Sequence, residues 1–190
     1  PLARRDPRVT GSEIPAALAE RARETGALAI DTEFMGEGRY RALLCLIQVA
    51  VADGDGPSRV EVLDPLDERL DCSPLAAILA DPEIEIVLHA GRQDVALLRR
   101  VWGTEVRNVF DTQVAAGFAG MRAQIGYEAL LNELLDLRVR KSASFTRWDA
   151  RPLSDEQVEY AREDVLHLLQ AADALKERLD RLGRLEWARE

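Results

Sequence analysis

The sequence predicts an α/β fold in which a mixed sheet begins with antiparallel strands and carries helices on both faces. Three observations lead to this prediction. Apolar runs of strand length fill the early part of the chain, a short Asp-Gly turn joins two of them, and strand and helix patterns then alternate until helices dominate. With 190 residues, 47% of them hydrophobic, the chain is long enough for one domain with a substantial core.

The early part of the chain is predicted to hold one helix and three strands. Residues 1–11 are polar and extended, either without order or as an edge strand. Ser12 is expected to cap a helix that runs to about Thr25, and Gly26 is expected to end it. The strands are expected at 27–34, 43–51 and 59–63, with the Asp-Gly turn at 53–56.

Helices dominate the rest of the chain. Ser73 is predicted to open a short helix to Ala80, which the following Asp-Pro pair breaks. One long helix is expected from Ser154 to about Leu182. The other elements are expected to be a strand at 83–89 and helices at about 92–101, 111–119 and 127–136.

Composition limits the function classes. The chain has 25 Lys+Arg against 34 Asp+Glu, a formal charge of -9, which argues against a protein that binds nucleic acid by bulk electrostatics. The negative charge is compatible with an enzyme that binds cations through carboxylates and phosphates through arginines. Cys45 and Cys72 lie in separate segments, so free thiols and a cytoplasmic location are expected. No apolar run has the roughly 18 residues of a membrane span.

Two carboxylates interrupt the end of the first apolar strand. Because strand side chains alternate between faces, Asp31 and Glu33 point the same way, roughly 7 Å apart along the chain. Two like charges at a buried position need a basic partner, a raised pKa or a divalent cation. The alternative is a strand end that turns into a polar loop.

Further acidic residues follow on later elements. Asp94 lies in the first turn of the helix that follows the strand ending at His89, near the sheet edge where α/β proteins bind ligands. The helix dipole also favours an aspartate there for structural reasons. Tyr160 and Asp164, at i and i+4, share one face of the late helix beside a buried stripe.

In these residues the sequence resembles the DEDD superfamily of 3′-to-5′ exonucleases, in the subgroup with a catalytic tyrosine, and within it the ribonuclease D family. Relatives with a catalytic histidine carry it where this chain has Glu159, so Tyr160 is the candidate. The resemblance covers about residues 27–170 and implies a ribonuclease H-like sheet. The matching segments are Ile30–Phe34, Leu46–Gln48, Leu63–Leu66, Leu88–Gly91 with Asp94, Phe110–Gln113, Lys141–Ser142, Trp148 with Ala150–Leu153, and Glu159–Tyr160 with Asp164.

The resemblance implies hydrolysis by two cations, Mg²⁺ or Mn²⁺, about 3.5 to 4 Å apart. Asp31 would bridge both, Glu33 and Asp164 would complete the site that activates water, and Asp94 would hold the second cation mostly through water. Tyr160 and Glu33 would orient the nucleophile. A tyrosine with a reference pKa near 10 is a poor base, so the metal would do the deprotonating.

Seven residues are expected to contact the substrate: Phe34, Met35, His89, Lys141, Arg147, Trp148 and Arg151. Each has an alternative. Phe34 and Met35 either stack on the 3′-terminal base or pack in the core. His89 either touches the terminal nucleotide or bonds to backbone, and Trp148 either contacts substrate or anchors its loop in the core.

The expected function is a metal-dependent 3′-to-5′ exoribonuclease that releases nucleoside 5′-monophosphates from single-stranded RNA. A DNA exonuclease of the proofreading type and an inactive nucleic-acid-binding module are the alternatives. The natural substrate stays open between tRNA precursors and very short RNA fragments. Residues 1–190 are expected to form a single exonuclease domain without the additional helical domain that ribonuclease D proteins usually carry after it.

Overall fold

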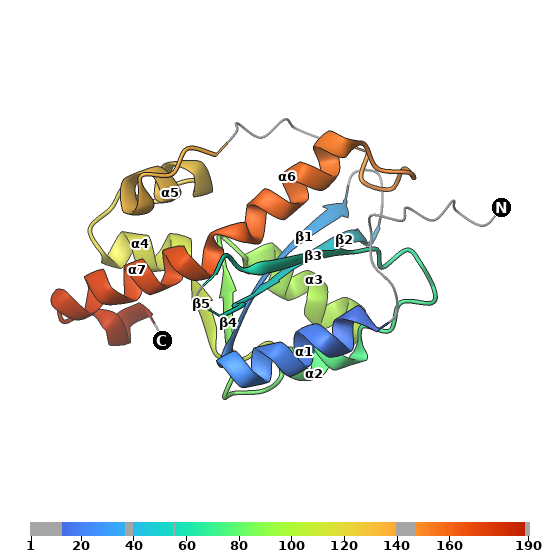
Figure 1. The fold of residues 1–190 in the computed structure, drawn as a ribbon, viewed down its shortest axis with the longest axis horizontal. Helices are drawn as coiled ribbons and strands as arrows, with labels where there is room; N and C mark the ends of the chain where they lie inside the picture. Colours follow the sequence, from blue (N-terminus) through green and yellow to red (C-terminus); the bar gives the residue numbers. More distant parts are fainter. Residues whose placement is uncertain (1–12, 37–39, 55, 140–146, 189–190) are drawn as a thin grey trace.

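The computed structural model describes residues 13–36, 40–54, 56–139 and 147–188. A five-stranded mixed sheet in the order β3-β2-β1-β4-β5 forms its centre (Figure 1). Its first three strands pair antiparallel, whereas β4 runs parallel to β1 and β5 runs parallel to β4, which confirms the predicted α/β class. The strands are β1 (Ala27–Met35), β2 (Leu43–Val51), β3 (Arg59–Leu63), β4 (Glu85–Leu88) and β5 (Val109–Asp111).

Helices cover both faces of this sheet (Figure 1). One face packs against α1 (Ile14–Thr25), α2 (Ser73–Leu79) and α3 (Arg92–Trp102). The other face packs against α4 (Thr112–Phe118), α5 (Tyr127–Leu135), α6 (Asp155–Leu166) and α7 (Leu168–Arg181), with the short helix η1 (Leu185–Ala188) beside α4 and α7.

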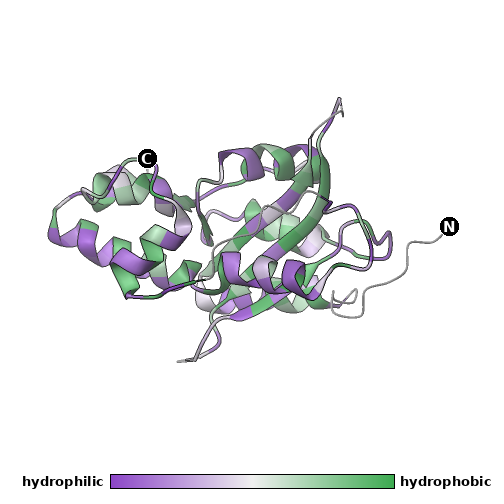
Figure 2. Ribbon diagram, turned by 90° about the horizontal axis from the view of Figure 1, so that it is seen from above, coloured by the Kyte–Doolittle hydropathy of each residue, from purple (hydrophilic) through white to green (hydrophobic). Residues whose placement is uncertain are grey.

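The alternation of strand side chains separates the two faces. On β1, Leu28 and Ile30 pack into the core beneath α1 to α3, whereas Ala29 packs into the core beneath α4, α5 and α7. Asp31 and Glu33 continue the Ala29 row, so they face the side covered by α6 and α7. In Figure 2 hydrophobic colour runs along the central strands, and hydrophilic colour marks stretches of the surrounding helices.

The structure differs from the prediction at two elements, and the predicted start of the chain lies outside the described residues. The single helix predicted from Ser154 to Leu182 is two helices, because His167 leaves helical geometry at φ -108° and ψ 8°. The break allows α6 to cross β2 and β3 while α7 packs on α4 and α5. Strand β5 was not predicted, because three residues are too short to display alternation. Residues 1–11 and the Ser12 cap lie outside the described residues; α1 begins at Ile14, with Glu13 at its N-cap.

Within the part of the chain that the structure describes, none of the helices has the length and apolar character needed to cross a bilayer.

Candidate active site

The site is built at the C-terminal half of β1, where the sheet leaves one edge of that strand open. The ladder between β1 and β4 ends at the pair Ala29–Val87, two residues before Asp31. On the other side β1 stays paired with β2, with a β-bulge between Glu33 and Phe34. A bulge twists and re-aims the strand, and such irregularities are common next to active sites.

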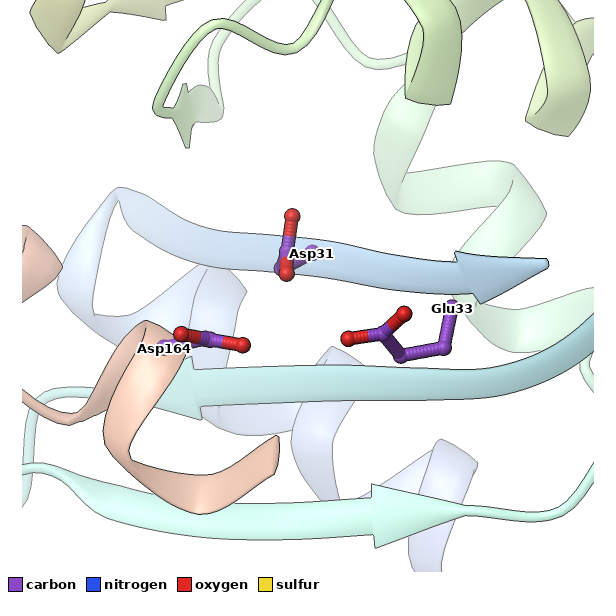
Figure 3. Close-up of side chains that lie close together, drawn as sticks. All are labelled: Asp31, Glu33 and Asp164. Carbon is purple, nitrogen blue, oxygen red and sulfur yellow. The ribbon is translucent and has the colours of Figure 1, made fainter. Parts of the chain in front are cut away.

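Three carboxylates converge at this position. Ligand oxygens of Asp31, Glu33 and Asp164 lie within 4.8 Å of one another. Figure 3 shows Glu33 and Asp164 extending toward each other while Asp31 projects beside them from β1. Asp164 is brought there by α6, which crosses the sheet over β2 and β3. The pair Asp31 and Glu33 expected from strand alternation is therefore joined by the carboxylate expected from the late helix.

Asp94 approaches the same group from the open edge of β1. It lies in the first turn of α3, is only 8% exposed, and accepts a hydrogen bond from the Thr32 hydroxyl. Its negative charge is close enough to raise the pKa of both Asp31 and Glu33. The predicted first-turn position of Asp94 is confirmed.

A second aspartate fixes the turn that leads into α3. Asp111 accepts hydrogen bonds from the backbone amides of Ala90 and Gly91, at 3.0 and 2.9 Å, and also from Gln113 and Val114 at the start of α4. Ala90 has a φ of 55°, a strained backbone conformation for alanine. Asp111 thus caps α4 and also holds the turn that precedes α3.

Crowding of the carboxylates favours their protonated forms. Burial, followed by the charges of Asp94, Asp164 and Glu33, raises the pKa of Asp31 well above its ordinary value. Burial, with the charges of Asp164 and Asp94, raises the pKa of Glu33 to about 8. Burial also raises the pKa of Asp164 to about 7, and the pKa of Asp94 is raised for the same reason. A cation bound among these groups reverses the effect by favouring the ionised forms.

Tyr160 lies beside Asp164 on α6. Its hydroxyl donates a hydrogen bond to the Asp164 carboxylate, and its ring centroid lies 6.0 Å from that of Trp148. Burial and the charges of Asp164, Glu33 and Asp31 raise the pKa of Tyr160, so the phenol remains a hydrogen-bond donor at neutral pH. This arrangement suits orientation of a water molecule or a substrate oxygen rather than proton abstraction.

The donor set fits a hard divalent cation. Asp31, Glu33, Asp94 and Asp164 offer only carboxylate oxygens, the ligands that Mg²⁺ and Mn²⁺ prefer. Among the described residues no ion pair joins a lysine or an arginine to any of the four. A partly buried negative cluster of this kind requires protonation or bound cations.

Three expected substrate contacts lie at the end of β1 or just after β4. His89 directly follows β4, and its Nδ1 forms a 2.9 Å hydrogen bond with the Thr112 hydroxyl; its ring packs against Tyr127 with the centroids 5.6 Å apart. Burial lowers the pKa of His89, which favours the neutral imidazole. Phe34 and Met35 are both partly exposed and both contact core clusters, so each of them packs in the core and still presents surface.

The other four expected substrate contacts are Lys141, Arg147, Trp148 and Arg151. The side chain of Arg151 is 4% exposed and binds Asp64 through two hydrogen bonds, of 2.6 and 2.7 Å, so the structure gives it a structural partner. Its remaining donors bind the backbone carbonyls of Cys45, Trp148 and Ala150. Trp148 is 4% exposed within a core cluster, the anchoring alternative. Lys141 lies outside the described residues, whereas Arg147 is exposed and pairs with Asp149.

A cleft not expected from the sequence adjoins the carboxylates. It has a volume of about 390 Å³ and lies between α5 and α6, next to Tyr160 and Asp164. Its other lining residues are Arg122, Gly126, Tyr127, Glu128, Ala129, Val139 and Glu163. These positions come from segments that are distant in sequence, so no local pattern could identify the cleft.

Comparison with known proteins first defines the class. A family model described as 3′-5′ exonuclease matches residues 8–180. The chain therefore belongs to the 3′-5′ exonuclease family.

Two similar curated proteins are both named ribonuclease D. The chain is 41% identical to the ribonuclease D of Gluconacetobacter diazotrophicus over 94% of its own length, and 41% identical to that of Granulibacter bethesdensis over 96%. It spans less than half the length of either relative, 44% and 45% respectively.

Solved structures agree with the family. Escherichia coli RNase D, an exoribonuclease involved in structured RNA processing, matches with a TM-score of 0.83 and 37% identity over 95% of this chain and 46% of the other. Brucella melitensis NrnC bound to pGG matches with a TM-score of 0.74 and 34% identity, over 87% of this chain and 79% of the other. NrnC with bound Mg²⁺ gives a TM-score of 0.73 at 33% identity, over the same shares.

Proposed function

We propose that this chain is a metal-dependent 3′-to-5′ exoribonuclease that releases nucleoside 5′-monophosphates, as its ribonuclease D relatives suggest. One observation carries the proposal. Four acidic side chains from three separate elements crowd together at the open edge of β1, and no basic side chain among the described residues pairs with them. A fold that needed these positions only for packing has apolar side chains available at much lower cost.

Asp31, Glu33, Asp94 and Asp164 would hold two Mg²⁺ or Mn²⁺ ions. When bound, such a pair supplies an activated water and neutralises charge at the phosphate and at the leaving oxygen. The Mg²⁺-bound NrnC structure supports this proposal, since that protein is similar to the chain over most of both lengths.

The chain's own residues then divide the remaining work. Asp31 is close enough to the other three acids for each of their charges to raise its pKa, and it is the candidate for a shared ligand. Tyr160, held by its hydrogen bond to Asp164, orients the attacking water together with Glu33. Asp94 is kept in position by the Thr32 hydroxyl and by the turn that Asp111 fixes.

The terminal nucleotide would enter from the cleft between α5 and α6. Tyr127 lines this cleft, and its ring packs on His89, which directly follows β4. His89, Phe34 and Met35 are therefore proposed to contact the terminal nucleotide. Arg122 on the rim and the exposed Arg147 are the described cations proposed to meet the phosphate backbone farther from the site.

Single-stranded RNA with a free 3′ end is the proposed substrate. Support comes from the ribonuclease D relatives and from the NrnC structure bound to pGG. A cytoplasmic location is proposed as well, because both Cys45 and Cys72 are free thiols and a reducing compartment keeps thiols in that state.

The test is a digestion series on matched RNA and DNA strands of several lengths, each labelled at the 5′ end. The expected product pattern is a ladder that shortens from the 3′ end of RNA in the presence of Mg²⁺ or Mn²⁺, with nucleoside 5′-monophosphates released. A circular strand serves as the control and should remain intact. Internal cuts in the circle contradict the proposal, and faster digestion of DNA than of RNA favours the proofreading alternative.

A further inference from the structure

One buried polar side chain beside the carboxylates has no assigned role. Gln48 lies in the middle of β2 and is 0% exposed, in a strand whose other residues are almost all apolar. Neither its amide nitrogen nor its amide oxygen has a hydrogen-bond partner within the described part of the chain. Buried side-chain amides are nearly always hydrogen-bonded, so a group with both atoms unpaired requires an explanation.

The strand register locates this amide next to the acidic cluster. Gln48 is the ladder partner of Asp31 on β1 and of Val62 on β3. Residues directly opposite one another in a sheet share a face, with Cβ atoms about 4.5 to 5.5 Å apart. Gln48 therefore lies on the face that carries Asp31 and Glu33.

Helix α6 closes the space above Gln48. Val62 and the α6 residue Ala161 belong to one core cluster, and α6 packs across β2 and β3. Asp164 lies one turn after Ala161 on the same helix and points toward Glu33 (Figure 3). The Gln48 amide is thus enclosed between the strand that carries Asp31 and the helix that carries Asp164.

A carboxylate that binds a cation turns one oxygen toward the metal and leaves the other in need of a hydrogen-bond donor. Donors in this outer layer orient the ligands and maintain metal affinity. The described surroundings of Asp31 are rich in acceptors, because Glu33, Asp94 and Asp164 are all carboxylates. The side-chain N–H groups of Gln48 are uncharged donors at the ladder position directly opposite Asp31.

We propose that Gln48 is a positioning residue of the metal site, whose amide N–H donates to the Asp31 carboxylate when cations are bound and so fixes the oxygen that faces the metal. This role rests on the proposed function, since it requires that the carboxylates hold cations. It also accounts for the unpaired amide, because the acceptor is oriented only in the loaded site. A side chain retained only for packing would gain nothing from two polar atoms at this position.

The test measures cation affinity directly, without substrate. Gln48→Met replaces the amide with an apolar side chain of similar length, and Mn²⁺ and Mg²⁺ binding to the metal-free protein is followed by titration calorimetry. We expect the Kd for the cations to rise by about 10- to 100-fold, the range typical of lost outer-layer partners. The melting temperature of the metal-free protein should stay the same or rise, because an unpaired buried amide is removed.

Ile47→Met is the matched control. Ile47 is the neighbouring residue on β2, equally buried, and it packs into the core on the opposite face. The cation affinity of the Ile47→Met variant should equal that of the parent protein. Should Gln48→Met not fold, Gln48→Leu provides the same measurement with a different apolar shape.

The outcomes separate this role from the proposed function. A parent protein that binds neither cation overturns the metal site and, with it, the role of Gln48. A parent that binds cations while Gln48→Met binds them equally well overturns the role of Gln48 alone. A variant that keeps parental cation affinity but melts at a lower temperature assigns Gln48 to packing, which also contradicts the proposal.

Discussion

Partly buried carboxylates occur at two places on the α6 side of this protein, and only one of the two has a basic partner among the described residues. Asp64, just after β3, binds Arg151 through both carboxylate oxygens, and the two side chains are 15% and 4% exposed. Arg151 also joins three backbone carbonyls, so its charge and its donors are fully used. The four acids of the active site, Asp31 among them, have no such counterion among the described residues.

The difference teaches how to distinguish a structural acid from a functional one. The Asp64–Arg151 pair is self-sufficient and holds the segment before α6 against the sheet. The cluster around Asp31 is incomplete by itself, because its pKa values are raised by burial and by mutual repulsion. The chain neutralises Asp64 with an arginine, whereas the charge of the four active-site acids is left to be neutralised by bound cations.

The largest expected effect comes from removing the central member of the incomplete cluster. Asp31→Asn preserves shape but removes a charge that both cations would share, so cleavage should fall by several orders of magnitude, since each 1.36 kcal/mol lost is about tenfold. The measurement is single-turnover cleavage of RNA with Mg²⁺, alongside equilibrium RNA binding with Ca²⁺. Binding should weaken far less than cleavage. Parental cleavage by Asp31→Asn would return these acids to a structural role.

The complete pair should respond in the opposite manner. Arg151→Met leaves Asp64 buried without a counterion, and the free energy of unfolding should fall by about 3 to 5 kcal/mol. Cation affinity of the folded variant should remain close to that of the parent. Chemical denaturation and calorimetry give the two quantities. Changing Asp64 to Asn as well should recover part of the loss, whereas Arg99→Met, in the exposed pair with Glu105, should have little effect.

A smaller effect is expected from pH in the metal-free protein. Glu33 and Asp164 have folded-state pKa values of about 8 and about 7, above their ordinary values of 4.5 and 3.8. The folded state therefore binds more protons than the unfolded state in this range, and stability should be highest near pH 4 and decline toward pH 8. Saturating Mg²⁺ should flatten the decline. Thermal melts at several pH values, with and without Mg²⁺, provide the measurement, and a metal-free stability that rises over this range contradicts the assignment.

The mildest effect should follow from Tyr160→Phe. The change removes the hydroxyl that bonds to Asp164 and leaves all four carboxylates in place. Deleting a hydrogen bond to a charged group is worth about 1.5 to 3 kcal/mol, so cleavage should slow by roughly 10- to 100-fold. Single-turnover rates are compared with those of Tyr40→Phe, a change at a fully exposed position. A loss as deep as that of Asp31→Asn would mean that Tyr160 does more than orient.

Local periodicity was enough to predict the members of the incomplete cluster. Alternation along a strand put Asp31 and Glu33 on one face, and the helical repeat did the same for Tyr160 and Asp164. The first-turn position of Asp94 came from the sequence as well. The structure brings all five side chains to one location, while their catalytic roles stay predictions that the experiments above address.

The Asp64–Arg151 pair was not predicted because its two members are far apart in the sequence. Arg151 was expected to contact the substrate, and no residue near it indicates that Asp64, 87 residues earlier in the chain, pairs with its charge. Trp148 was ambiguous because an aromatic side chain suits both a core and a binding surface.

The sequence by itself determined the α/β class, the carboxylates and the elements that carry them, because these depend on repeats of two or 3.6 residues within one segment. Only the tertiary structure decided which charges find partners. It broke the late helix at His167, buried Arg151, brought Asp94 past the end of the β1–β4 ladder and enclosed Gln48 opposite Asp31. Each of these features depends on contacts between residues far apart in the chain. The burial and the charge of a side chain are set by such contacts, which a local sequence pattern does not predict.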